Sequence, residues 1–248
     1  MENNELIKRA EDLRERCERS ASLTHSNYLT PAERYQIEKW AAFTPDCRVL
    51  FYGGAPDCER TVAFFLPDYM EEKDLDPSEY FSALRLTAGF GSPGHRDYMG
   101  ALLGMGIGRE WLGDIRVDGS TAVLFCLPSV KRHLLGIEKV GRYGVRAEEL
   151  PLDQVPALKR KVKEKSFSVM SPRLDAVVAG LFDLSRTEAA RQISAGNVSL
   201  NYSQSDKPDT TVSEGDIVSL RGAGKGKITG TGGLSRKGRL FVYAEVYQ

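Results

Sequence analysis

The sequence has no net charge to attract a partner. Its 248 residues include 34 Lys and Arg and 34 Asp and Glu, which gives a formal net charge of +0. Attraction to nucleic acid or another polyanion must therefore come from a local cluster of basic residues. Hydrophobic residues make up 41% of the chain and charged residues 27%, which is ordinary for a globular protein.

Long hydrophobic runs are also missing. No apolar run approaches the roughly 18 residues of a membrane-spanning helix, so we expect no membrane partner. The first residues, MENNELIKRAEDLRERCERS, are charged and contain no apolar core of a secretion signal. We therefore expect a cytoplasmic protein.

Metal-binding and disulfide patterns are absent from the sequence. No pair of cysteines has the C-x-x-C spacing of zinc or redox sites, and the histidines have no metal-like spacing. We expect reduced thiols, no metal and no cofactor. The residues concerned are Cys17, Cys47, Cys58, Cys126, His25, His95 and His133.

Acidic residues are missing from one stretch, 217–244. Glycines between its bases let the backbone approach phosphate, so we predict an RNA-binding surface here. A flexible, solvated hairpin is the alternative. The alternating segment RLFVYAEVY (239–247) favours an ordered final strand. The bases are Arg221, Lys225, Lys227, Arg236, Lys237 and Arg239.

Residues 1–75 are predicted to form a helical and α/β unit. A second helix begins with a capping box at Thr30 and Glu33, and strands are expected at 48–52 and 61–66. The first helix has one apolar stripe, made of Leu6, Ala10, Leu13 and Cys17.

Residues 76–150 change to a βαββαβ pattern, typical of ferredoxin-like or RRM-like domains. The third strand, TAVLFCL, has one aromatic residue and no base, so it lacks the RNA-stacking signature of RNA-recognition motifs. Residues 151–165 contain two prolines and a charge run, which favour a linker. The fold class is therefore α+β. The elements are expected at 80–88, 95–106, 112–117, 121–127, 128–140 and 142–150.

Residues 166–248 form the last predicted domain. One helix is expected after Ser171, and a second begins at Ser185 with a capping box closed by Glu188. Gly196 is placed to end that helix, and NVSLN then alternates as a strand. The first helix has an apolar stripe made of Leu174, Val177, Val178, Leu181 and Phe182.

Arg173 and Arg186 are predicted in the first turns of these helices. A helix start already favours anions, so a basic side chain there opposes the helix dipole. A bound anion would explain both arginines, and replacing both with Glu would then leave folding nearly intact. Alternatively, each pairs with a nearby acid, and the available acids are Asp175, Asp183 and Glu188.

The run PRLDAVVAGL…LSRTEAARQISAGNVSLN…VSEGDIVSL resembles the RNA-binding domain named after ribosomal protein S-four, the alpha-L motif. The resemblance implies that Arg173, Arg186 and Arg191 face RNA. The segment NYSQSDKPDT departs from the usual short Asn-Gly turn, so we expect a longer hairpin after Asn201.

A wider resemblance covers nearly the whole chain. The segments GGAPDCER, GSPGHRDYMGALLGMGIGREWLGDI and GDIVSLRGAGKGKI are similar to the YlmH family of bacterial proteins. This implies a noncatalytic protein linked to the large ribosomal subunit, to rescue of stalled peptidyl-tRNA and, genetically, to cell division. We expect a monomer that binds ribosomal RNA, tRNA or both.

Enzyme motifs are incomplete. HRD at 95–97 lacks the other kinase signatures, and GMGIG at 104–108 is not preceded by the strand of a methyltransferase turn. PRLD and HRD only partly match pseudouridine synthases. An RNA-modifying enzyme and a cell-division adaptor remain the alternatives. His95 and Arg96 are possible RNA contacts or else capping and packing residues, and Asp97 could cap the helix. Arg109 is a possible RNA contact or else pairs with Glu110 or Asp114.

Overall fold

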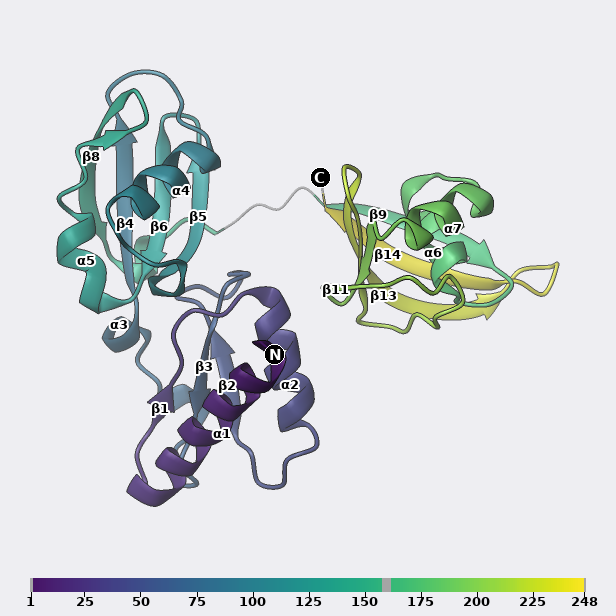
Figure 1. The fold of residues 1–248 in the computed structure, drawn as a ribbon, viewed down its shortest axis with the longest axis horizontal. Helices are drawn as coiled ribbons and strands as arrows, with labels where there is room; N and C mark the ends of the chain where they lie inside the picture. The colour runs from purple at the N-terminus through teal and green to yellow at the C-terminus, as the bar shows by residue number, and fades with distance from the viewer. Residues whose placement is uncertain (1, 158–161, 248) are drawn as a thin grey trace. The chain divides into compact units, whose positions relative to one another are not determined.

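The computed structural model describes residues 2–157 and 162–247. The chain divides into two compact units, residues 1–158 and 159–248 (Figure 1). Both units combine helices with antiparallel sheets, as the α+β prediction requires.

The first unit begins with helices packed on a small sheet of strand order β1-β3-β2. The capping box is confirmed, since Glu33 N donates to Thr30 Oγ1 at 3.3 Å and Thr30 N donates to Glu33 Oε2 at 2.7 Å. The predicted stripe is buried at Ala10 and Cys17. The elements are α1 (Glu2–Ser20), β1 (Thr24–His25), α2 (Pro31–Ala41), β2 (Val49–Tyr52) and β3 (Val62–Phe65).

Strand β3 is buried on both faces. Phe65 packs in the core formed with α1 and α2, whereas Phe64 belongs to a second core that includes Phe81 and Phe125 of the following domain. Because the residues on a strand alternate between its faces, one strand serves both cores. The N-terminal region and the middle domain are thereby packed together.

The middle domain has the predicted βαββαβ order with one additional short strand, and its strand order is β5-β6-β4-β8-β7. The helix expected at 128–140 is too long, because it ends at Leu134 and residues 139–140 form the additional strand, β7. Helices α4 and α5 cover one face, where Tyr98, Leu102 and Leu134 pack against Leu84 and Leu86. The elements are η1 (Glu72–Asp74), α3 (Pro77–Tyr80), β4 (Ser82–Ala88), α4 (His95–Gly104), η2 (Arg109–Trp111), β5 (Leu112–Asp118), β6 (Thr121–Cys126), α5 (Pro128–Leu134), β7 (Lys139–Val140), β8 (Tyr143–Leu150) and η3 (Leu152–Gln154).

The second unit is a sheet of order β11-β10-β12-β13-β14-β9 with α6 and α7 on one face (Figure 1). The predicted stripe of α6 fills this core, and Gly196 ends α7 with φ 72°. The elements are β9 (Val162–Val169), α6 (Leu174–Phe182), α7 (Arg186–Ser194), β10 (Val198–Leu200), β11 (Ser203–Gln204), β12 (Ile217–Leu220), β13 (Gly224–Leu234) and β14 (Leu240–Tyr247).

The linker expected at 151–165 is too long. Residues 162–165 begin β9, which pairs with β14 from Val162 opposite Tyr247 to Val169 opposite Leu240. The charged residues of this segment show no strand pattern, yet its backbone groups form hydrogen bonds with β14, which is distant in the sequence. Residues 158–161 of the expected linker lie outside the described residues.

The longer hairpin expected after Asn201 is also wrong. Asn201 and Tyr202, with φ of 49° and 66°, make a two-residue turn between β10 and β11. Positive φ at both turn residues matches the twist of a tight hairpin. The additional residues instead return to α6, where Thr210 O accepts from Leu174 N at 2.8 Å.

Candidate nucleic-acid interface

Asp175 on α6 binds two arginines at once. Arg186 of α7 donates from Nη2 to Oδ2 of Asp175 at 2.5 Å, and Arg173 donates from Nε to Oδ1 at 3.3 Å. The Asp175 side chain is 9% exposed, whereas Arg186 and Arg173 keep 56% and 43% of their side-chain surface exposed. A buried carboxylate thus holds two accessible guanidinium groups.

The backbone around α6 fixes this geometry. Arg173 is the N-cap residue, in an extended conformation, and no side chain caps the helix. Instead, Leu174 N donates to Thr210 O at 2.8 Å, and Asp175 N donates to Pro208 O at 2.9 Å. Because the loop satisfies these first helical amides, the Asp175 carboxylate is left to bind the arginines.

These contacts correct the interpretation of the helix starts. Arg173 precedes α6, so only Arg186, the first residue of α7, stands in a first turn. The alternative of acid pairing is correct for both arginines, through Asp175, whereas Asp183 binds Lys165 at 2.6 Å. The premise that Glu could replace both arginines without affecting folding is therefore wrong, because it would leave a buried carboxylate unpaired.

The two arginines also keep Asp175 ionised. Burial by itself raises the pKa of this carboxyl, but the hydrogen bonds from Arg186 and Arg173 outweigh burial, and the pKa lies below its usual value. At neutral pH the cluster therefore contains one negative and two positive groups. Its excess positive charge faces solvent, where it can meet an anion.

Arg191 pairs with Glu188 on the same helix. Its Nε and Nη2 each donate to the Glu188 carboxylate at 2.8 Å, and these bonds lower the pKa of Glu188 to about 2. The predicted capping box is only half formed. Ser185 Oγ accepts from Glu188 N at 3.1 Å, but the carboxylate binds Arg191 and Gln192 instead of the Ser185 amide.

The acid-free stretch contains a hydrogen-bonded hairpin tip between β13 and β14. Strands β13 and β14 pair as far as Leu234 opposite Leu240. Ser235 N then donates to Arg239 O, and Gly238 N donates to Ser235 O, both at 2.8 Å. The exposed bases of this tip are Arg236, Lys237 and Arg239.

Lys225 and Lys227 lie on the sheet face opposite α6 and α7. A Cβ on the intervening Gly226 would meet Leu181 Cδ2 of α6 at 3.0 Å, so Gly226 faces the helices. Adjacent strand residues point the other way. Arg221 is exposed in the turn between β12 and β13. The bases predicted to bind RNA in this unit thus occupy the helix layer, the opposite sheet face, the turn between β12 and β13 and the hairpin tip.

The middle-domain candidates are not brought together. His95 and Arg96 are exposed in the first turn of α4. Asp97 Oδ2 accepts from the backbone amide of Gly94, the N-cap residue, at 2.8 Å, so Asp97 caps this helix. Arg109 lies in η2, beyond the other end of this helix, and its carbonyl accepts from Arg60 Nη2 at 2.9 Å. A helix of this length separates its ends by about 15 Å.

Comparison with known proteins identifies the chain. Residues 81–154 match the family described as "Putative RNA-binding domain in YlmH", and residues 172–218 match the S4 domain. The chain is 29% identical over 224 residues to the Bacillus subtilis (strain 168) "Ribosome-associated protein quality control protein P2", covering 89% of this chain and 86% of the relative. Together these matches support the YlmH family, with a C-terminal S4 domain, for this chain.

A solved YlmH structure has a related fold. The "Cell division protein ylmH from Streptococcus pneumoniae" superposes with a TM-score of 0.53 at 20% identity, over 62% of this chain and 93% of that chain. At this identity the likeness concerns the fold alone.

The first YlmH-like segment, GGAPDCER, has a structural role in this chain. Asp114 of β5 accepts from the backbone amides of Glu59 and Arg60 at 2.8 and 2.9 Å. Arg116, also on β5, donates from Nη2 to Asp57 Oδ1 at 2.5 Å. The segment therefore ties the N-terminal region to the YlmH middle domain.

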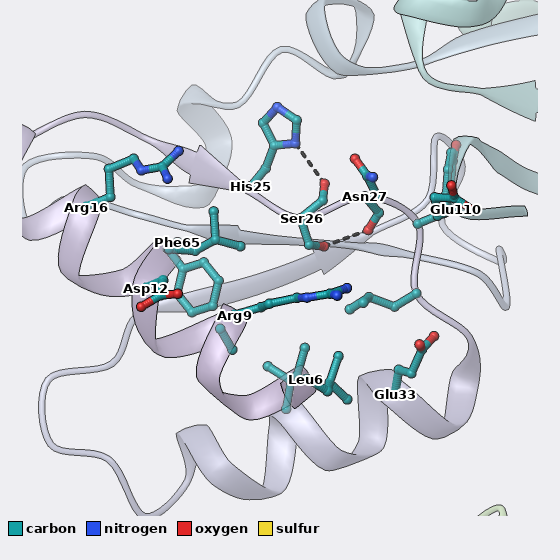
Figure 2. Close-up of a pocket in the computed structure, with 15 residues that line it drawn as sticks. Leu6, Arg9, Asp12, Arg16, His25, Ser26, Asn27, Glu33, Phe65 and Glu110 are labelled. Carbon is teal, nitrogen blue, oxygen red and sulfur yellow. Dashed lines mark hydrogen bonds between the residues drawn. The ribbon is translucent and has the colours of Figure 1, made fainter. Parts of the chain in front are cut away.

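A cavity of about 380 Å³ lies beside α1 in this YlmH-family chain (Figure 2). Figure 2 shows His25 directed at the Ser26 carbonyl, with 2.8 Å between Nδ1 and that oxygen. Ser26 Oγ donates to Asn27 O at 2.7 Å and accepts from Ala63 N. A catalytic base would accept a hydrogen bond from the nucleophilic hydroxyl, but here His25 contacts the Ser26 carbonyl and the Ser26 hydroxyl donates to Asn27 O. These two described residues are therefore not arranged as a base and a nucleophile.

Within residues 2–157 and 162–247, no group of three or more His, Cys, Asp or Glu side chains could hold a metal ion. In the same part of the chain, no helix has the length and apolar character that crossing a membrane requires.

Proposed function

We propose that this chain is a noncatalytic RNA-binding protein that associates with the large ribosomal subunit and tRNA, and acts in quality control of stalled ribosomes. The observation that carries this proposal is the buried Asp175 carboxylate that aligns Arg173 and Arg186 on the S4 domain. A guanidinium held on one side by a carboxylate keeps N–H donors for phosphate oxygens on its other sides. The name of the Bacillus subtilis relative supports the ribosomal setting.

Each set of bases has a role in this proposal. The helix arginines Arg173, Arg186 and Arg191 contact the RNA backbone, which fixes the orientation of the protein. The other bases add attraction that depends on salt, because each neutralised phosphate releases counterions. The protein acts as a monomer in the cytoplasm and needs no cofactor. The contributing bases are Arg221, Lys225, Lys227, Arg236, Lys237 and Arg239.

Co-sedimentation with ribosomal particles tests the proposal. The wild-type chain should travel with the large subunit in a sucrose gradient, and Arg186→Gln together with Asp175→Asn should remain at the top. This pair of changes removes the acid along with its partner, so no buried charge is left unpaired. Arg9→Gln, which removes an exposed arginine paired with Glu5 on α1, is the matched control. A wild-type chain that never leaves the top fractions would refute the ribosomal role.

A second experiment addresses the alternatives. Incubation with bulk RNA, with and without S-adenosylmethionine, should leave the nucleoside composition unchanged. New pseudouridine or methylated nucleosides would instead identify an RNA-modifying enzyme. Capture of a division protein that persists after ribonuclease treatment, without ribosome association, would favour the adaptor.

A further inference from the structure

The sheet face that RRM-like domains use for RNA is covered in this chain. In RNA-recognition motifs, aromatic residues on the central strands stack on bases. Here Phe125 of β6 is fully buried, and the guanidinium of Arg116 lies 4.9 Å from its ring centroid. A Cβ on Gly54 would meet the Phe125 ring at 2.7 Å, which shows how closely the N-terminal region packs there. A base cannot reach this aromatic residue.

A different aromatic pair is accessible at the edge of the same domain. Phe90, in the loop between β4 and α4, is 62% exposed, and its ring centroid lies 5.6 Å from that of Tyr143 at the start of β8. The guanidinium of Arg142 lies 5.2 Å from the Tyr143 ring centroid, and its Nη2 donates to Tyr143 Oη at 3.2 Å. The three side chains form one aromatic and cationic cluster.

The backbone holds this cluster in place. Gly89 N donates to Gly144 O at 3.0 Å, so the loop after β4 is bound to β8. Gly91 has φ +68°, and a Cβ there would lie 2.5 Å from Tyr143 Cε1. The loop therefore passes directly over the Tyr143 ring, in a conformation that suits glycine. An aromatic side chain on such an anchored loop is preorganised for stacking.

The charges around the pair complement RNA. The segments 89–97 and 138–146 that build this edge contain two acids, Asp97 and Glu138, and the Asp97 carboxylate is bound to the backbone amide of Gly94. The bases of the same segments outnumber these acids and are all exposed. They are His95, Arg96, Lys139, Arg142 and Arg146.

We propose that Phe90 and Tyr143 bind an unpaired RNA base by stacking, while Arg96 and Arg142 contact the neighbouring phosphates. This inference rests on the proposed RNA-binding function and assigns the middle domain its own contact. Exposed aromatic rings flanked by arginines are the usual means of holding single-stranded RNA without sequence preference. The site therefore selects unpaired over duplex RNA.

Fluorescence anisotropy with the full chain tests this site. The probes are a labelled oligouridylate of about ten nucleotides and a duplex RNA of similar length. Phe90→Ala should weaken binding of the single strand about fivefold or more, the effect of losing one stacked base, and leave duplex binding unchanged. Phe90→Trp should retain binding. Phe43→Ala, at another exposed Phe of the same unit, is the matched control and should change neither affinity.

The outcomes separate this inference from the general function. If the wild-type chain binds RNA but Phe90→Ala behaves like Phe43→Ala, the stacking site is overturned and the proposed function stands. The same conclusion follows if Phe90→Ala weakens duplex and single strand equally. If the wild-type chain binds neither probe nor ribosomal particles, both proposals fail. Thermal melts confirm that each variant is folded.

Discussion

Arg186, the first residue of α7, donates a 2.5 Å hydrogen bond to Asp175, eleven residues earlier on α6. This bond joins the starts of two helices and makes one acid the common partner of Arg186 and Arg173. Both arginines therefore stabilise the fold through Asp175, and both still expose part of their side chains to solvent. Their contributions to folding and to RNA binding must be separated by the choice of substitution.

Charge reversal of both arginines should damage the fold as well as the interface. In Arg173→Glu with Arg186→Glu, the buried Asp175 would lose both partners and face two like charges. We expect a loss of about 1–3 kcal/mol in the free energy of unfolding of the second unit. Hydrogen exchange of peptides from α6 and α7 measures this loss. Exchange as slow as in the wild type would contradict the structural role of Asp175.

The Asp175 cluster should also contribute to acid sensitivity. Because the folded-state pKa of Asp175 is lowered, its stabilising contribution is fully present above the unfolded pKa of about 4 and is lost as pH falls through the folded value. The stability difference between the wild type and Asp175→Asn should therefore shrink from pH 7 towards about pH 3. Far-UV circular dichroism during urea unfolding measures this difference. Tryptophan fluorescence would not report on the second unit, because both Trp40 and Trp111 lie in the first unit. Hydrogen exchange shows which unit has changed in stability. A constant difference would show that Asp175 does not titrate differently on folding.

The hairpin tip should act through electrostatics alone. Replacing Arg236, Lys237 and Arg239 with Gln leaves the backbone bonds of the tip in place and should leave the melting temperature unchanged. The slope of log affinity for single-stranded RNA against log salt should flatten by about 0.7 for each phosphate contact removed. Lys8→Gln, at an exposed position on α1, is the control for loss of charge. An unaltered slope in the triple variant would remove the tip from the interface.

Arg116 should be essential to the first unit. Its side chain is 9% exposed, and it binds Asp57 and lies over the Phe125 ring. Arg116→Ala should lower the free energy of unfolding by about 2–4 kcal/mol, through the loss of a largely buried ion pair and a cation–π contact. Tryptophan fluorescence reports on this unit. Arg85→Ala breaks an exposed pair with Glu148 and should cost no more than about 1 kcal/mol. Equal losses for the two variants would argue against a special role for Arg116.

Much of the fold could be predicted from local patterns. The capping box at Thr30, the apolar stripe of α6 and the βαββαβ order follow from residue spacing, because spacing determines which side of an element is buried. Strand β9 (Val162–Val169) was not predicted, because its first half is charged and shows no apolar alternation, and its stability comes from pairing with β14. Asp175 could have been suspected as an acid in the first turn of an otherwise apolar helix.

The sequence by itself was enough to indicate an RNA-binding protein through its S4-type and YlmH-type motifs, whereas the RNA contacts of its acid-free basic stretch and of its arginines stay predictions. Only the tertiary structure decided which groups meet. It paired Arg173 and Arg186 through Asp175, buried Phe125 beneath Arg116, and brought Phe90 to Tyr143. The physical reason is that periodicity specifies which face of an element is covered, whereas the covering partner comes from elsewhere in the chain and is fixed only by packing.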